Sequence, residues 1–518
     1  MLTYSANLHY LYHTICAIIL ILVCPHKMYG KHISSKERII TRVVPIITNG
    51  RFIIMEKKER NSFTGSLGFV LAASASAVGL GNIWRFPYLA ARDGGGLFLV
   101  IYLILSVTFG FTLLLTEIAI GRKTRQSPLT AYGELNRRWK PLGLVACIVP
   151  MMILPYYCVI GGWVIKYLIA FLTGSGTQTA ADSYFTDFIT DTQSPIIMMI
   201  IFLALTMIVV LAGVNKGIEN FSKTAMPILV MLIIIISVFS LTINHQDADG
   251  TVRTGLQGLK ILLVPDLTGV TFSGLFTTIM DAMGQLFYSL SIAMGIMIAY
   301  GSYMKDDSSV EKSVAQIEIF DTSIAFLAGV MIIPAVYAFN GREGMEASGP
   351  GLMFISLPKV FEEMGSMGNL VGCMFFALVL FAATTSSVSI LEAIVSSFMD
   401  QFGMERKTAT ITECAITLFF AVIVCLGYNR LYFEVTLPNG AVGQILDIMD
   451  YISNNLLMPI VSIGTCILVG WVLKPDIIID EVTKNGEPFR RRGIFLIMLR
   501  CVAPLLLLIL LLIALGIL

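Results

Sequence analysis

The segment that most constrains this chain is an apolar stretch whose middle is poorly suited to a helix. It includes Ser74–Pro87, with the sequence Ser-Ala-Ser-Ala-Val-Gly-Leu-Gly-Asn-Ile-Trp-Arg-Phe-Pro, and lies in a run long enough to cross a membrane. Its serines, its glycines and Asn82 lower helix propensity and offer polar atoms. In hydrocarbon, an unwound turn is tolerated only where protein or a water-filled cavity satisfies its backbone. Because secondary transporters build ion and substrate sites in this way, the segment indicates a transporter.

Composition agrees with a membrane protein. Hydrophobic residues make up 56% of the 518 residues and charged residues only 13%, and the mean hydropathy is +0.81. A soluble domain carries about 25% charged residues, whereas long uncharged apolar runs are typical of transmembrane helices. We therefore predict an all-α integral membrane protein in a lipid bilayer. The net charge of +1 argues against a nucleic-acid partner, and the nine scattered cysteines are interpreted as small buried hydrophobes.

Apolar segments after residue 60 predict about eleven transmembrane helices. Their approximate ranges are 66–90, 96–121, 142–172, 195–213, 221–243, 272–303, 316–339, 369–399, 409–426, 444–473 and 493–517. Basic residues gather before the first segment, after the second and between the tenth and eleventh, whereas the loop 173–194 has none. The positive-inside rule then predicts that residues 55–65 are cytoplasmic and that the C-terminus lies outside.

The first 54 residues do not fit this pattern. Their apolar core, Ile15–Val23, is too short for a spanning helix. A signal peptide fits poorly, because the next segment must begin in the cytoplasm. Met55 and the charged residues after it resemble a natural start, so we interpret residues 1–54 as an N-terminal extension outside the core.

A second interruption occurs in the sixth span. Gly284–Gly295 again places glycine and serine in the middle of an apolar segment. Small residues also mediate ordinary helix packing in membranes, which would explain a single such patch. Two patches at matched positions favour an inverted repeat with its site at mid-membrane. We therefore predict a first repeat of five spans in 55–243, a second in 244–473, and a cytoplasmic loop with the eleventh span in 474–518.

Several of these residues form a recognisable signature. Ser76–Pro87, followed by Arg92-Asp93-Gly94-Gly95-Gly96, closely resembles the first-helix motif of the neurotransmitter:sodium symporter family, although relatives often carry Asn at the position of Asp93. The resemblance extends over residues 60–518, through Gly284–Tyr303 and Thr384–Ser387. It implies the LeuT fold, a 5+5 inverted repeat with broken first and sixth helices. Eleven spans rather than twelve is similar to the bacterial amino-acid transporter branch, which implies a bacterial cytoplasmic membrane.

The resemblance also implies a substrate site. Half-helix N-termini attract anions, so the backbone of Leu80 and Gly81, with the Tyr157 hydroxyl, is expected to hold a substrate carboxylate. Monoamine transporters of the family carry Asp at the position of Gly79, and a glycine there implies an amino acid. The full set of expected substrate-binding residues is mostly apolar, which favours a hydrophobic or aromatic side chain. These residues are Ala77, Gly79, Leu80, Gly81, Ile153, Tyr157, Tyr288, Ser289, Ser291, Met294, Ser386 and Ile390.

Two sodium sites follow from the same resemblance. Na⁺ is a hard cation that prefers oxygen ligands, which released carbonyls and hydroxyls supply. The first site is expected to include the substrate carboxylate, which would couple the two binding free energies. Its protein ligands would be Ala77, Asn82, Ser289 and Asp321, and those of the second site would be Ala75, Val78, Ala382, Thr385 and Ser386.

Charged residues in apolar surroundings complete the expected mechanism. Many relatives have Asn at the position of Asp321, and a carboxylate in a membrane core indicates function. Its charge would replace the chloride that some relatives require, so we predict chloride independence. By resemblance, Arg85 and Asp450 form an outer gate, Arg60 and Asp400 an inner gate, and Glu117 bonds the unwound part of the sixth span. Phe63 stands where relatives have Trp, and the role of Glu392 stays open.

The predicted function is sodium-coupled symport of an amino acid into the cell by alternating access. An enzyme is not expected, because the chain lacks H-E-x-x-H, G-x-S-x-G and paired-Asp motifs and has no histidine within its predicted spans. A sensor that keeps the amino-acid site without transporting remains an alternative. The sequence leaves open which amino acid is bound, whether a proton is returned, and whether the protein forms a homodimer.

Overall fold

The computed structural model describes residues 46–48, 51–53, 62–246, 250–267, 271–342, 344 and 349–518. The chain divides into two compact units, residues 1–60 and 61–518. In the first unit, β1 (Ile46–Thr48) pairs antiparallel with β2 (Arg51–Ile53). The rest of the predicted extension, and the gate residue Arg60, lie outside the described residues.

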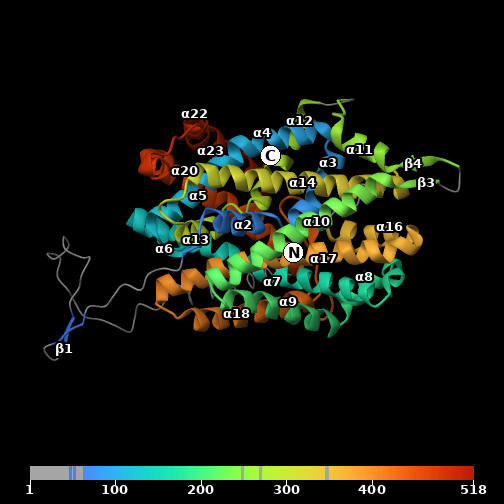
Figure 1. Cartoon of the computed structure of the whole chain (residues 1–518), viewed down its shortest axis with the longest axis horizontal. Helices are drawn as coiled ribbons and strands as arrows, with labels where there is room; N and C mark the ends of the chain where they lie inside the picture. The colour runs from blue at the N-terminus through green and yellow to red at the C-terminus, as the bar shows by residue number, and fades with distance from the viewer. Residues whose placement is uncertain are drawn as a thin grey trace, which may run out of the picture. The chain divides into compact units, whose positions relative to one another are not determined.

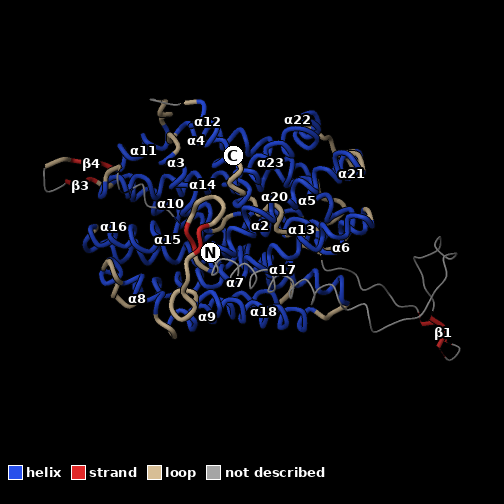
Figure 2. Tube along the Cα trace, turned by 180° about the vertical axis from the view of Figure 1, so that it is seen from behind, coloured by secondary structure: helices blue, strands red, loops and turns tan. Residues whose placement is uncertain are grey.

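The second unit is built almost entirely of helices (Figure 2). Its first half contains α2 (Ser66–Ala77), η2 (Gly81–Arg85), α3 (Phe86–Arg92), α4 (Gly96–Leu105), η3 (Ser106–Gly110), α5 (Phe111–Thr124), α6 (Pro128–Leu135), η4 (Arg137–Trp139), α7 (Lys140–Leu172), η5 (Gly176–Ala180), α8 (Tyr184–Thr190), α9 (Ser194–Leu211), η6 (Val214–Glu219) and α10 (Asn220–Thr242), where η marks short 3₁₀ or π turns. Two small hairpins lie in later loops, β3 (Asn244–Gln246) with β4 (Val252–Thr254) and β5 (Val435–Thr436) with β6 (Val442–Gly443).

The second half repeats the helical pattern. It contains α11 (Gly255–Leu263), α12 (Phe272–Ser289), α13 (Ile296–Tyr303), α14 (Val310–Asn340), α15 (Gly349–Gly351), η8 (Leu352–Ser356), α16 (Leu357–Glu363), η9 (Gly365–Met367), α17 (Gly368–Phe402), α18 (Arg406–Leu426), α19 (Ile445–Asp450), η10 (Tyr451–Leu457), α20 (Met458–Ile467), η11 (Leu468–Val472), α21 (Asp476–Val482), η12 (Lys484–Gly486), α22 (Arg492–Ile497), η13 (Met498–Val502) and α23 (Ala503–Ala514). Many spans therefore consist of two or three consecutive helical pieces.

Nine helices of the described residues are long and apolar enough to cross a membrane, and the bent pair at Ser66–Arg92 makes a tenth. This confirms an all-α membrane architecture. The difference from eleven predicted spans lies in 272–303, which is divided into α12 and α13. Between them, Ser291, Ala293 and Gly295 adopt positive φ angles of 53°, 64° and 72°, which a continuous right-handed helix does not contain.

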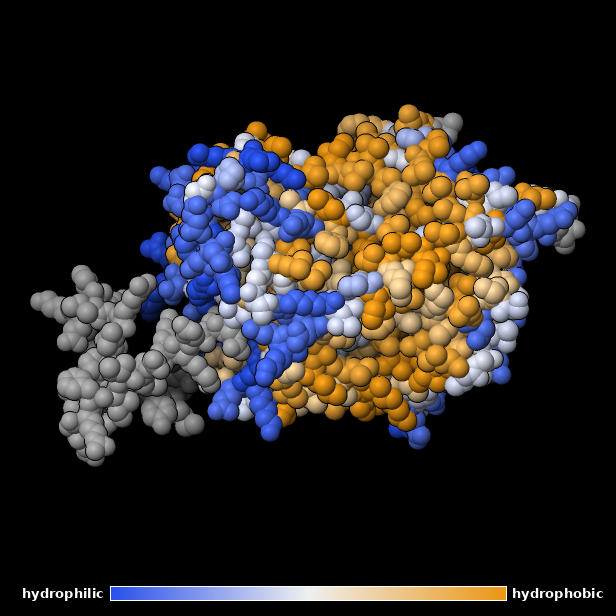
Figure 3. Space-filling model, in the orientation of Figure 1, coloured by the Kyte–Doolittle hydropathy of each residue, from blue (hydrophilic) through white to orange (hydrophobic). Residues whose placement is uncertain are grey.

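The interior of the second unit is formed by two long helices, α7 and α17, which pack against each other. In the apolar windows of their spans, 72% and 78% of residues are buried, against 17% in the last span, Arg492–Ala514. The exposed faces are nevertheless apolar, and Figure 3 shows a broad hydrophobic surface with hydrophilic residues gathered toward its margins. Such a surface suits a lipid solvent, in which an exposed leucine costs nothing.

Candidate functional site

The site begins at two helix interruptions that the fold places together. α2 ends at Ala77, and the next segment, Gly81–Arg92, leaves at an angle of 54°. α2 contacts α13, and the two helices lie side by side within the second unit (Figure 1). The Ser291 hydroxyl donates a hydrogen bond to the Ser76 carbonyl at 3.2 Å, so the second break satisfies a backbone group freed by the first.

A small cavity lies between these breaks, α7 and α17. All twelve residues predicted to bind substrate line it, together with Ser76 and Asn82. The structure therefore brings together residues that are up to 313 positions apart, Ala77 and Ile390 being the extremes. Their roles toward a substrate stay predictions.

Two glycines keep the cavity open. A Cβ at Gly79 would lie 2.7 Å from the Ser386 hydroxyl oxygen and 3.3 Å from that of Tyr157. A Cβ at Gly81 would lie 2.6 Å from the ring of Tyr288. The buried Tyr157 hydroxyl has no hydrogen-bond partner among the described residues. Because burying an unpaired hydroxyl is unfavourable, this group is suited to a ligand atom.

The Asp321 side chain is completely buried and gathers polar groups from three helices. Its Oδ1 accepts hydrogen bonds from Ser289 Oγ at 2.6 Å and Asn82 Nδ2 at 2.8 Å, and its Oδ2 accepts one from the Tyr102 hydroxyl at 3.2 Å. Three of the four predicted ligands of the first sodium ion therefore lie together. Their carboxylate, amide and hydroxyl oxygens suit a hard monovalent cation. Sequence reasoning missed Tyr102, because one tyrosine in an apolar run carries no spacing signal.

The second predicted ligand set lies where α2 meets α17. Ser386 Oγ donates to the Ser76 carbonyl at 3.0 Å and joins the two helices. Thr385 Oγ1 instead donates within its own helix, to the carbonyls of Phe381 at 3.1 Å and Ala382 at 3.0 Å. A hydroxyl that donates in this way keeps its oxygen lone pairs, so these residues also fit a cation.

Comparison with known proteins decides the class of the site. A model of the sodium:neurotransmitter symporter family matches residues 60–195 and 175–517. The chain belongs to this family. This symporter is therefore a sodium-coupled transporter and not an enzyme.

Three similar proteins illustrate the relationship. An uncharacterised sodium-dependent transporter of Bacillus subtilis, YhdH, is 33% identical over 410 residues, which cover 78% of this chain and 86% of the relative. The sodium- and chloride-dependent GABA transporter 2 of Rattus norvegicus is 24% identical over 476 residues, with coverages of 82% and 75%. The crystal structure of MhsT in complex with L-phenylalanine matches with a TM-score of 0.76 and 34% identity, covering 88% of this chain and 100% of MhsT. The expected LeuT fold is thereby confirmed.

The breaks of the symporter are braced by two side chains. Glu117 Oε1, on α5, accepts a hydrogen bond from the backbone N–H of Ala293 at 2.7 Å, which confirms its expected contact with the unwound part of the sixth span. Gln285 Nε2, on α12, donates to the Gly81 carbonyl at 3.0 Å. Sequence reasoning missed Gln285, whose partner lies 204 residues away.

The predicted outer gate residues Arg85 and Asp450 form no direct ion pair among the described residues. Asp450 accepts hydrogen bonds from the Tyr156 hydroxyl at 3.0 Å and Asn454 Nδ2 at 2.6 Å. Arg85 Nη2 lies near Gly284, 3.5 Å from where a Cβ would be. The pairing of Arg85 with Asp450 stays a prediction.

At the predicted inner gate, Asp400 accepts a hydrogen bond from the backbone N–H of Ser127 at 2.7 Å. Phe63, which stands where relatives have Trp, is well packed. It is 1% exposed and packs edge-on against Tyr300 and Tyr303, with ring centroids 5.6 and 6.2 Å apart. Although Phe63 is smaller than a tryptophan, it therefore still packs closely against its neighbours.

Glu392 now has a definite environment. Its side chain is fully buried. Oε2 lies 2.5 Å from Arg406 Nη1, and Oε1 accepts bonds from Arg406 Nη2 at 2.8 Å and the Tyr303 hydroxyl at 2.7 Å. Glu392 therefore ties α17 to α18 and to α13.

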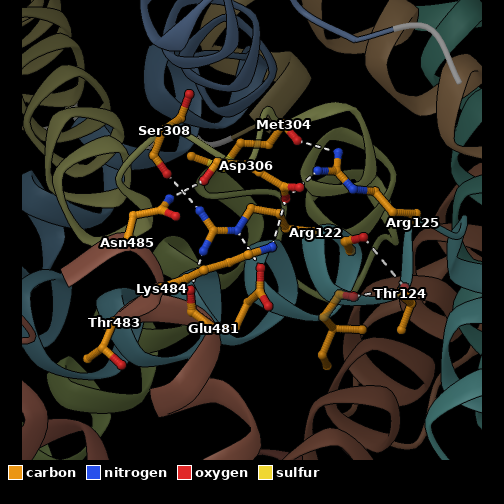
Figure 4. A network of polar contacts seen from close by, with 12 residues as sticks. Arg122, Thr124, Arg125, Met304, Asp306, Ser308, Glu481, Thr483, Lys484 and Asn485 are labelled. Atoms are coloured by element: carbon orange, nitrogen blue, oxygen red, sulfur yellow. Dashed lines mark hydrogen bonds and ion pairs between the residues drawn. The ribbon is translucent and has the colours of Figure 1, made fainter. Parts of the chain in front are cut away.

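A further polar network joins α21 and its following turn to α5 and to the loop after α13 (Figure 4). Arg122 pairs with Glu481 at 2.6 Å, and both side chains are buried. Asp306 in the loop pairs with Arg125 at 2.5 Å and Lys484 at 3.0 Å. These contacts fix the 474–491 loop against the ends of neighbouring spans.

Proposed function

We propose that this symporter carries a hydrophobic or aromatic amino acid into the cell together with Na⁺. The observation that supports this most is the cavity between the breaks, which offers groups suited to a carboxylate. Leu80 and Gly81 line it, the Tyr157 hydroxyl has no hydrogen-bond partner among the described residues, and Gly79 leaves room where a side chain would clash. The MhsT structure, which contains L-phenylalanine, agrees with a ligand of this class.

The remaining cavity walls supply the rest of the recognition. By the family resemblance, the carbonyls of Ala77, Tyr288 and Ser289, with Ser291, are proposed to receive the ammonium group, and all four residues line the cavity. Ile153, Met294 and Ile390 contribute apolar surface, which favours an apolar side chain over a charged one. Methionine adapts to irregular shapes, so the pocket tolerates side chains of different size.

We further propose two sodium ions. The first would be held by Ala77, Asn82, Ser289 and Asp321, and by the substrate carboxylate. The second would be held by Ala75, Val78, Ala382, Thr385 and Ser386, across the junction of α2 and α17. Because the carboxylate of the amino acid would itself be a ligand of the first ion, each would strengthen binding of the other by the same free energy.

Chloride independence is proposed from Asp321. Its carboxylate is fixed by three hydrogen bonds within the predicted first sodium site, so a covalent negative charge is already present there. A mobile anion would meet like-charge repulsion at that position. The name of the GABA transporter describes that relative as chloride-dependent, so the proposal makes this chain different from it.

Alternating access would proceed by movement of the broken helices against α7 and α17. Arg85 and Asp450 would close above the cavity, and the inner half of the first span would release below it. We place residues 55–65 in the cytoplasm and the C-terminus outside, in a bacterial cytoplasmic membrane, because basic residues cluster in the loops assigned to the inside.

The decisive experiment is uptake of labelled amino acids into proteoliposomes, with and without an inward Na⁺ gradient and with chloride replaced by gluconate. Sodium-driven accumulation of an apolar amino acid that persists in gluconate supports the proposal. A Gly79→Asp variant is a matched control and is expected to abolish uptake. Sodium-dependent binding without accumulation would instead indicate a sensor, and absence of any amino-acid binding would refute the proposed carboxylate site.

A further inference from the structure

The cytoplasmic half of the first span is held at its start by a residue from another helix. Glu219 ends η6, immediately before α10, and its carboxylate is completely buried. Oε2 accepts a hydrogen bond from the backbone N–H of Thr64 at 2.9 Å, and Oε1 accepts one from the Thr64 hydroxyl. Thr64 lies two residues before α2 and 155 residues from Glu219.

α2 lacks a cap of its own. Its N-cap is Gly65, which has no side chain, and its first turn contains no acidic residue. A helix N-terminus carries unpaired N–H groups and a partial positive charge, which a carboxylate stabilises. Gly68 leaves the space that the carboxylate occupies, because a Cβ there would lie 2.1 Å from Glu219 Oε1. The first turn of α2 is therefore shaped to receive this carboxylate.

Two lysines complete the arrangement around Thr64. Lys223 Nζ lies 2.7 Å from Glu219 Oε1 and donates to the Thr64 hydroxyl at 3.4 Å. Lys305 Nζ, in the loop after α13, donates to the Thr64 carbonyl at 2.9 Å. Every polar group of Thr64 is thus bonded to a residue outside α2, directly beside the buried ring of Phe63.

We propose that Glu219 is a positioning residue for transport, which latches the cytoplasmic end of α2 and must release it for the cavity to open inward. We call Glu219, Thr64 and Gly68 the α2 latch. The inference rests on the alternating-access function proposed above. A buried carboxylate that loses its partners is strongly disfavoured, so the latch favours the inward-closed state until hydration replaces those bonds. Weakening it would shift the population toward the inward-open state.

The test uses two variants that weaken the latch from opposite sides. Glu219→Gln removes the charge at nearly constant shape, and Gly68→Ala displaces the carboxylate sterically. Glu413→Gln is the matched control, because Glu413 is also a fully buried carboxyl, on α18, whose bond is to Thr417 of the same helix. Hydrogen exchange is measured on the purified full chain in Na⁺, with peptides covering residues 62–78, α7 and α17.

We expect exchange in residues 62–78 to rise about tenfold in both latch variants, which corresponds to about 1.4 kcal/mol, while α7 and α17 are unchanged. We also expect about threefold more Na⁺ for half-maximal amino-acid binding, because two ions bind and the square of their concentration offsets a tenfold smaller competent population. The control should change neither quantity. Unchanged exchange in Glu219→Gln, or an equal rise in all helices, would overturn the latch.

Failure of the latch and failure of the proposed function are distinguishable. Wild-type protein that shows no sodium-driven uptake refutes the function, whatever the exchange data show. Wild-type protein that accumulates amino acid, with a Glu219→Gln variant whose exchange and sodium dependence match it, refutes only the latch. Should Gly68→Ala fail to fold, the Glu219→Gln and Glu413→Gln pair decides the question.

Discussion

Replacing Asp321 by Asn tests the most specific electrostatic claim about this symporter. The substitution keeps the size of the side chain and removes a charge that accepts bonds from Ser289, Asn82 and Tyr102 at 2.6, 2.8 and 3.2 Å. The carboxylate is completely buried, so solvent screens it weakly. We expect the variant to bind Na⁺ more weakly in the absence of chloride and to recover when chloride is present.

The expected size follows from charge and distance. Two unit charges about 4 Å apart attract by about 4 kcal/mol at an effective dielectric constant of about 20. Relief of the cost of burying the carboxylate offsets part of this, so we expect a net loss of about 2 kcal/mol. That is about a 30-fold increase in the dissociation constant of the first Na⁺ and, because two ions bind, about fivefold more Na⁺ for half-maximal amino-acid binding.

The assay is equilibrium binding of the labelled amino acid against Na⁺, in gluconate and in chloride. Tyr102→Phe is the matched control, because it keeps the charge and removes one hydrogen bond to it. We expect the control to shift the Na⁺ dependence by less than Asp321→Asn and to be insensitive to chloride. An Asp321→Asn variant with wild-type Na⁺ dependence in gluconate, or with a defect that chloride leaves unchanged, would refute the reasoning.

Three other substitutions have definite expected outcomes. Tyr157→Phe should weaken amino-acid binding by about tenfold at unchanged thermal stability, because the hydroxyl has no partner among the described residues. Glu392→Gln should lower stability by about 3 kcal/mol, measured as a fall in Tm, because Arg406 then keeps its charge without a counter-charge. Partial burial acts to raise the pKa of Asp306, but the Lys484 ammonium and the Arg125 guanidinium together outweigh it and leave that pKa below its usual value. Such a group stabilises the fold above the unfolded pKa of about 4, so the Tm difference between wild type and Asp306→Asn should shrink as pH falls below about 4.

The sequence by itself determined the class of this protein and the position of its breaks. Apolar runs of spanning length have one stable solution in a bilayer, so the membrane helices were predictable from composition. The break around Gly79 and the one around Ser291 were also predictable, because glycine and serine weaken a helix locally. The cavity residues were predictable through the family signature, because a resemblance to the family assigns all the binding positions together.

Tertiary structure alone decided how buried polar groups find partners. Tyr102 on Asp321 and Glu219 on Thr64 are contacts between segments 219 and 155 residues apart, and Arg406 on Glu392 joins two successive helices. In a membrane, lipid-facing and interior faces are both apolar, so hydropathy does not reveal which face of a helix is inward. Packing settles that orientation, and with it the bonds that buried polar side chains must form because no water replaces them.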